Sequence, residues 1–88
     1  MTIETRPFAI DIPESDLVDL RERLARTRFP GEIPGSDWGY GTDLSYLRDL
    51  VAYWHESYDW RQHEKRLNQL QQSQVKVDDL WIHVIHER

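Results

Sequence analysis

An aromatic-rich segment, residues 37–60, constrains the fold of this chain more than any other stretch. It holds seven of the ten aromatic residues in an 88-residue sequence, namely Trp38, Tyr40, Tyr46, Tyr53, Trp54, Tyr58 and Trp60. Large aromatic side chains dominate burial energetics in small domains. The way in which this segment packs therefore decides what the rest of the chain must provide.

Residues 43–57 have the periodicity of a helix with a wide apolar face. At 100° per residue the apolar side chains cover roughly half of the circumference, whereas packing against one core needs a stripe of about 100°. Thr42 is the expected N-cap, and Asp43 in the first turn suits the positive end of the helix dipole. The apolar side chains are Leu44, Tyr46, Leu47, Leu50, Val51, Tyr53, Trp54 and Tyr58.

One part of this wide face is not needed for a core. Contact with the other helices requires only Leu44, Leu47, Val51 and Trp54. We predict that the remaining edge, Tyr46, Leu50 and Tyr53, is a domain interface, because exposed apolar patches mark such surfaces. The alternative is that the glycine-rich loop before the helix folds back and covers it.

Composition excludes several classes of partner and site. Eleven Lys and Arg residues stand against 16 Asp and Glu, which gives a net charge of −5 and argues against nucleic acid or an anionic membrane as a partner. There is no cysteine, so disulfides and thiolate metal sites cannot form. Residues 1–6 lack the apolar run of a signal peptide or anchor, and a cytoplasmic location is expected. Homo-oligomer formation is left open.

The N-terminal third predicts an extended segment followed by a helix. Phe8, Ile10 and Ile12 alternate with smaller or polar residues, the pattern of a half-buried strand or extended arm. Pro13 marks the start of a helix, whose buried face is formed by Leu17, Leu20 and Leu24.

Two arginines, Arg21 and Arg28, fall in the middle of the apolar arc of this first helix. In one interpretation their aliphatic stems cover apolar surface while the guanidinium groups reach water. In the other, at least one forms a structural ion pair with a carboxylate in a buried setting. The candidate carboxylates are Asp37, Asp43 and Asp59.

The remaining elements are a shaped loop, a third helix and a hairpin. Residues 29–42 carry all four glycines and two of the four prolines, which predicts successive turns. Ile33, Trp38 and Tyr40 are expected to hold this loop on the helices. Asp59 opens a helix with Leu67 and Leu70 toward the core. Residues 75–77 and 80–86 read as two strands around a turn at Asp78–Asp79. The predicted fold is thus mostly α.

No catalytic, cofactor-binding or metal site is predicted. His55-Glu56 and His63-Glu64 begin like a zinc-protease motif, but the second histidine of that motif is absent from both. His83 and His86 lie three apart on a strand, so they point to opposite faces. The glycines match no phosphate-binding spacing, and no serine lies in a nucleophile elbow.

A set of ordered motifs resembles the N-terminal domain of microsomal-type epoxide hydrolases from about residue 7 to the end. The motifs are Arg26-Thr27-Arg28-Phe29-Pro30, Trp38-x-Tyr40-Gly41, Tyr53-Trp54, Tyr58-Asp59-Trp60-Arg61, Leu67-Asn68 and Ile82-His83-Val84-Ile85-His86. The chain departs from the family where Leu70, Gln71 and Gln72 replace an aromatic and a proline, and where Asp79 replaces a turn glycine.

The resemblance implies a helical meander, residues 1–72, that wraps an α/β-hydrolase domain whose first strands are the hairpin at residues 73–88. It also implies that the aspartate nucleophile, histidine base and epoxide-holding tyrosines lie beyond Arg88, so this chain alone would lack catalytic residues. The chain is then expected to be a structural domain whose partner is the catalytic domain of an epoxide hydrolase. The alternatives are the same meander on an α/β-hydrolase-like protein with different chemistry, or a free-standing helical interaction module.

Overall fold

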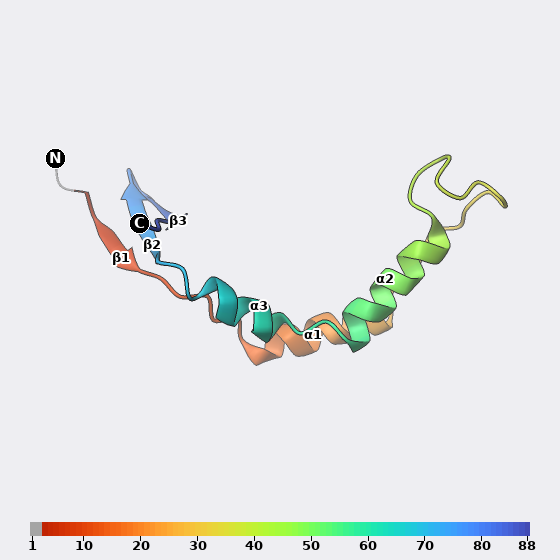
Figure 1. Ribbon diagram of the computed structural model, residues 1–88, viewed down its shortest axis with the longest axis horizontal. Helices are drawn as coiled ribbons and strands as arrows, with labels where there is room; N and C mark the ends of the chain where they lie inside the picture. Colours follow the sequence, from red (N-terminus) through yellow and green to blue (C-terminus); the bar gives the residue numbers. More distant parts are fainter. Residues whose placement is uncertain (1–2) are drawn as a thin grey trace. The chain divides into compact units, whose positions relative to one another are not determined.

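The computed structural model describes residues 3–88, which form three helices and three strands (Figure 1). Their order is β1 (Thr5–Pro7), α1 (Glu14–Ala25), α2 (Leu44–Glu56), α3 (Trp60–Leu67), β2 (Gln72–Val77) and β3 (Leu80–Ile85). The predicted fold class, three helices with an N-terminal strand and a C-terminal hairpin, is confirmed. No helix within residues 3–88 has the length and apolar character needed to cross a membrane.

The chain divides into two compact units, Met1–Asp11 with Asp59–Arg88, and Ile12–Tyr58. The first unit contains α3 and the three strands, and the second contains α1, α2 and the glycine-rich loop. The predicted domain boundary between residues 72 and 73 concerns a catalytic domain outside this chain and stays a prediction. That position lies at the first residue of β2.

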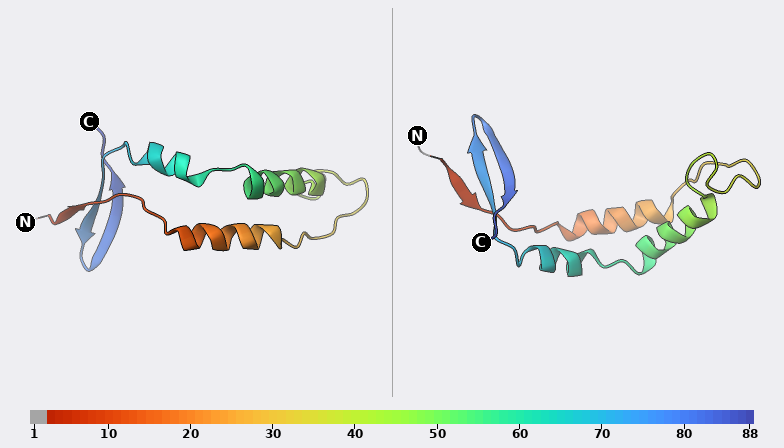
Figure 2. Two further views of the ribbon diagram at one scale, coloured as in Figure 1. Left: turned by 90° about the horizontal axis from the view of Figure 1, so that it is seen from below. Right: turned by 45° about the horizontal axis from the view of Figure 1, so that its top comes forward.

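The strands of the first unit form an antiparallel sheet in the order β1-β2-β3 (Figure 2). The β2–β3 hairpin runs from the Gln72↔Ile85 pair to the Val77↔Leu80 pair. Its two-residue turn at Asp78–Asp79 is the predicted one, and Asp78 takes a positive φ of 53°, a conformation that aspartate tolerates better than most residues. β1 pairs with the other edge of β2, with Thr5 opposite Val75.

The first strand lies upstream of the predicted one. Phe8, Ile10 and Ile12 are half-buried while Ala9 and Asp11 are exposed, so the alternation of burial is present. The backbone there is nevertheless an extended arm and not a strand, because beyond Phe8 it bonds to a side chain of the α3 end. Of the two structures predicted for this segment, a half-buried strand or an extended arm, the chain forms the extended arm.

In the second unit α1 packs on α2, and the ends of both helices are defined by local sequence. α1 starts directly after Pro13, and its Leu17 is the one buried apolar residue among those described. The N-cap of α2 is Asp43 and not the predicted Thr42, because the Asp43 carboxylate accepts from the Tyr46 N–H at 2.9 Å. Glu32 from the loop adds a second acceptor, for the Leu44 N–H at 3.1 Å.

Replacing Asp43 with alanine is expected to destabilise the protein by about 1 kcal/mol, the usual cost of losing an N-cap. Urea unfolding monitored by circular dichroism measures this. Asp49→Ala is the matched control, because Asp49 lies mid-helix on an exposed position and its loss should stay within about 0.5 kcal/mol. Equal losses for the two variants would contradict the capping role.

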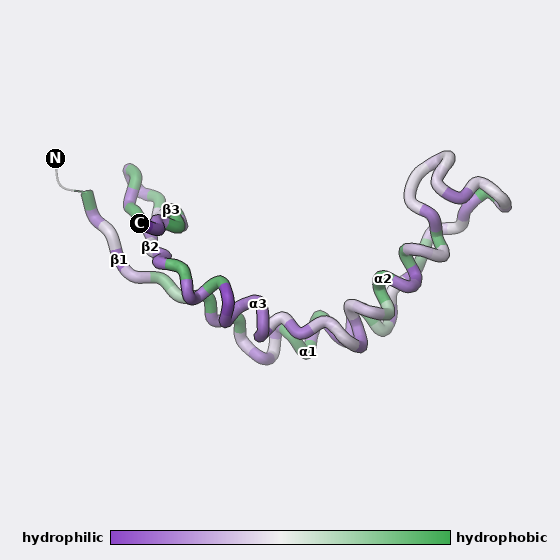
Figure 3. The backbone as a smooth tube through the Cα atoms, in the orientation of Figure 1, coloured by the Kyte–Doolittle hydropathy of each residue, from purple (hydrophilic) through white to green (hydrophobic). Residues whose placement is uncertain are grey.

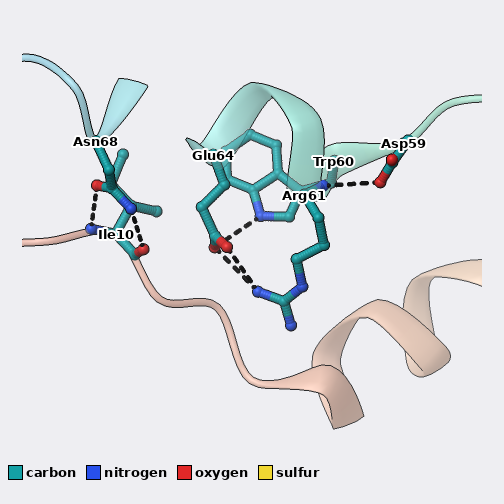
Figure 4. A network of polar contacts seen from close by, with 6 residues as sticks. All are labelled: Ile10, Asp59, Trp60, Arg61, Glu64 and Asn68. Atoms are coloured by element: carbon teal, nitrogen blue, oxygen red, sulfur yellow. Dashed lines mark hydrogen bonds and ion pairs between the residues drawn. The ribbon is translucent and has the colours of Figure 1, made fainter. Parts of the chain in front are cut away.

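A buried acid organises α3 (Figure 4). The helix starts at the Asp59 N-cap, whose carboxylate accepts from the Arg61 N–H at 3.1 Å. Glu64, only 8% exposed, accepts from the Trp60 indole N–H at 3.2 Å and from Arg61 Nη1 at 2.9 and 3.1 Å. The prediction that Leu67 and Leu70 form the inner face of α3 is wrong for Leu70, which is exposed.

Candidate domain interface

Helix α2 has one apolar face that packs inside its unit and a second that does not. The inner face consists of half-buried Leu44, Leu47, Val51 and His55. The second face, here called the α2 stripe, consists of Tyr46 (52% exposed), Leu50 (46%), Tyr53 (58%) and Trp54 (43%). In Figure 3 hydrophobic positions of α2, coloured green, alternate with white and purple ones.

Trp54 was assigned by the sequence pattern to the inner face, and this assignment is wrong. Helical spacing places Trp54 between the two faces, about 40° from Leu50 and about 20° from Leu47, and its side chain is 43% exposed. His55 follows Val51 by four residues and takes the inner position instead. The other three predicted interface residues, Tyr46, Leu50 and Tyr53, are all exposed in this chain, and their docking role stays a prediction.

The glycine-rich loop covers only one end of the α2 stripe. The Trp38 ring contacts the Tyr46 ring with centroids 5.2 Å apart and planes tilted by 54°. Even so, more than half of the Tyr46 side chain stays exposed, and no ring contact reaches Tyr53 among the residues described. The glycine-rich loop therefore covers part of Tyr46, through Trp38, and leaves the rest of the α2 stripe open.

The loop is shaped by tight turns, as its composition predicts. Gly39 donates to the Ser36 carbonyl at 2.7 Å, and a Cβ at position 39 would come within 2.9 Å of that oxygen. Ile33 and Tyr40, expected to hold the loop on the helices, are exposed instead. Both line a pocket of about 430 Å³ between the loop and the first turns of α2, together with Glu32 and Asp37. Two carboxylates and no basic residue line this pocket, which is unsuited to a phosphate.

The two arginines singled out in α1 and after it lie at the surface of this chain. Arg21 Nη1 is 3.9 Å from Glu14 Oε1, and both side chains are more than half exposed. Arg28 is exposed as well. Of the three expected partners, Asp43 and Asp59 cap helices instead. The buried ion pair is thus not formed within the described chain, and an exposed pair of this kind contributes little to stability.

The hairpin of the first unit leaves apolar side chains exposed on both of its faces. Val77, Leu80, Ile82 and Ile85 are between 45% and 68% exposed. Within residues 3–88, β1 and β2 occupy the other positions of the sheet, so β3 has one edge without a strand neighbour from Leu80 to Ile85. An apolar strand with a free edge favours pairing with a further strand.

One histidine, His83, packs between the arm and β2. His83 Nε2 lies 2.8 Å from Gln72 Oε1, and its ring packs at 4.8 Å from that of Phe8. No group of three or more metal-binding side chains is found within residues 3–88.

The chain matches the family model described as epoxide hydrolase N terminus over residues 5–88. A Stigmatella aurantiaca protein named as a candidate epoxide hydrolase is 43% identical over 82 residues, which are 93% of this chain and 19% of that protein. Epoxide hydrolase 1 of Sus scrofa is 31% identical over 81 residues, which are 92% of this chain and 18% of that protein.

Solved structures show the same likeness. The structure of Aspergillus niger epoxide hydrolase superposes with a TM-score of 0.85 at 26% identity, over 93% of this chain and 22% of that one. Juvenile hormone epoxide hydrolase from the silkworm Bombyx mori gives a TM-score of 0.84 at 28% identity, over 96% of this chain and 22% of that one. The chain spans about a fifth of the length of each of these relatives.

Proposed function

Because the chain belongs to the epoxide hydrolase N-terminus family, we propose that the longer protein carrying it adds water to epoxides to give diols, and that this domain buttresses the catalytic domain. The family match over residues 5–88 and the likeness to the N-terminal fifth of epoxide hydrolases support the reaction. The exposed α2 stripe is the observation that supports the buttressing role.

The physical reason for docking is the apolar area that this domain leaves in water. Each fully buried aromatic or large aliphatic side chain contributes about 1.5–3 kcal/mol, and the four residues of the α2 stripe are each about half exposed. Tyrosine suits a domain interface, because its ring buries area while its hydroxyl finds a polar partner. We infer that the α2 stripe packs on the α/β-hydrolase domain of the same protein.

The hairpin supports the same partner by a different contact. The free edge of β3 offers backbone donors and acceptors from Leu80 to Ile85, flanked by exposed apolar side chains. A strand of the α/β-hydrolase sheet at this edge would satisfy both requirements. In this proposal the domain is joined to its partner through the α2 stripe in one unit and through the β3 edge in the other.

The 88-residue chain alone is expected to hydrolyse no epoxide, because the proposed nucleophile and base lie outside it. Diol formation from styrene oxide, measured by chromatography, should stay at the buffer rate with the chain and exceed it with the longer protein. Hydrolysis of a nitrophenyl ester without diol formation by the longer protein would favour the alternative, an α/β-hydrolase-like protein with different chemistry. Epoxide turnover by the 88-residue chain alone would overturn the proposal that the nucleophile and base lie outside it.

A further inference from the structure

The N-terminal arm stays fastened beyond the end of β1, although no strand lies beside it there. The Phe8 N–H donates to the Gln72 carbonyl at 3.2 Å. Two residues later, both backbone groups of Ile10 bond to one side chain: its N–H donates to Asn68 Oδ1 at 2.8 Å, and its carbonyl accepts from Asn68 Nδ2 at 2.8 Å (Figure 4). The Asn68 amide thus makes the paired bonds that a residue of a neighbouring antiparallel strand would make.

Gln72 fixes the orientation of this amide. Its Nε2 donates to the Leu67 carbonyl at 2.7 Å and, at 3.3 Å, to Asn68 Oδ1. Since Asn68 Oδ1 then accepts from two donors, Asn68 Nδ2 is the atom left to face the Ile10 carbonyl. Gln72 Oε1 accepts in turn from His83 Nε2 at 2.8 Å, and the His83 ring packs against Phe8 of the arm. Asn68, Gln72 and His83, here called the arm latch, connect the arm with α3, β2 and β3.

We propose that the arm latch sets the register of β1 on β2 and keeps the N-terminal arm closed over the outer edge of β2. A shift of the arm by one residue would place Ala9 or Asp11 against the Asn68 amide. The same shift would turn Phe8 and Ile10, now half-buried, to the opposite face. The latch therefore disfavours a one-residue slip of the arm.

β1 needs such a device because it is weak by itself. It has three residues, all of them exposed, and ends at Pro7, which has no N–H to donate. Its side-chain contacts are at the surface: Arg6 Nε donates to Gln74 Oε1, and the Arg6 guanidinium lies 3.8 Å from the Trp81 ring centre. Just before the strand, Glu4 lies 3.6 Å from Lys76. Exposed ion pairs contribute little. Without the arm, the edge of β2 would be open to another strand.

Hydrogen exchange with residue-resolved mass spectrometry on the longer protein tests the latch in Asn68→Ala. The reporters are the amides of Phe8 and Ile10, and that of Lys76, which donates to the Glu4 carbonyl at 3.0 Å. With two hydrogen bonds of about 1 kcal/mol each removed, all three amides should exchange at least about tenfold faster. Amides that bond β2 to β3 should be unchanged.

Two further variants make the result decisive. Gln69→Ala removes an exposed amide side chain one residue further on and should leave all three reporters as in the unchanged protein. Asn68→Asp keeps the shape and the acceptor for the Ile10 N–H but has no proton for the Ile10 carbonyl, so it should speed exchange of the reporters by less than Asn68→Ala does. Faster exchange at Ile10 alone, with Phe8 and Lys76 still protected in both Asn68 variants, would overturn the proposal. An equal effect of Gln69→Ala would also overturn it.

Discussion

Replacing Tyr46 and Tyr53 with alanine together is expected to lower the free energy of unfolding of the longer protein by about 4 kcal/mol, from about 2 kcal/mol for each aromatic side chain at the centre of an interface. The loss follows from the proposed docking, because both rings would leave an apolar contact with the catalytic domain. Urea unfolding of the longer protein measures it. The rate of diol formation per folded molecule should be unaffected, because neither tyrosine has a proposed catalytic role.

The same two substitutions in the 88-residue chain separate docking from packing within the domain. Tyr46 and Tyr53 are 52% and 58% exposed there, so their joint loss should cost only about half as much, roughly 2 kcal/mol. Ser45→Ala, at an exposed position of α2 that lies off the stripe, is the control and should be nearly silent in both proteins. Equal destabilisation by the tyrosine changes in the chain and in the longer protein would mean that nothing docks on the α2 stripe.

Glu64→Ala is expected to destabilise the protein by about 2–3 kcal/mol. The change removes the acceptor of the Trp60 indole N–H and of the Arg61 guanidinium. Breaking a fully buried pair costs about 3–5 kcal/mol, but the Arg61 side chain is 37% exposed and can regain water, which reduces the loss. Urea unfolding followed by tryptophan fluorescence reports the change directly, because Trp60 is one of the partners.

Glu64→Gln serves as the companion variant. It keeps one side-chain oxygen as an acceptor but loses the charge that faces Arg61, so its cost should fall between zero and that of Glu64→Ala. Glu56→Ala, an exposed glutamate of α2, controls for the general loss of a negative charge. A cost for Glu64→Ala no larger than for Glu56→Ala would show that solvent screens the network around Glu64.

Local features of the fold could be predicted from the sequence because short-range periodicity determines them. The helix expected at residues 43–57 is Leu44–Glu56, and the turn expected at Asp78–Asp79 closes the hairpin. The position of β1 could not be predicted, because Thr5 pairs with Val75 and nothing in residues 5–7 encodes that distant partner. The choice of Asp43 over Thr42 as N-cap was not settled by residue type either, since both residues are good caps.

Part of the candidate interface could be predicted, because the apolar face of the second helix is wider than packing against one core requires. Tyr46, Leu50 and Tyr53 were identified on that ground and are exposed. The exposure of Trp54 could not be predicted from spacing, because this residue lies between the two faces of the helix, closer in angle to Leu47 than to Leu50. The burial of Glu64 was not predicted, because acidic side chains are rarely buried. The sequence did contain a signal for its contacts, since Glu64 follows Trp60 by four residues and Arg61 by three. Family membership was recognisable from ordered motifs, although no reaction chemistry could be assigned to this chain.

The distant pairing of β1 also sets an order of events on the ribosome. At about 5–20 residues per second, synthesis delivers the β2 partners of Thr5 roughly 4–14 seconds after Thr5 itself is made. The β2–β3 hairpin can then close within microseconds, because its strands are adjacent in the chain. The sheet is therefore assembled backwards, with its first-made strand added last. Until then the nascent N-terminus has no backbone partner in the sheet and is open to nascent-chain chaperones.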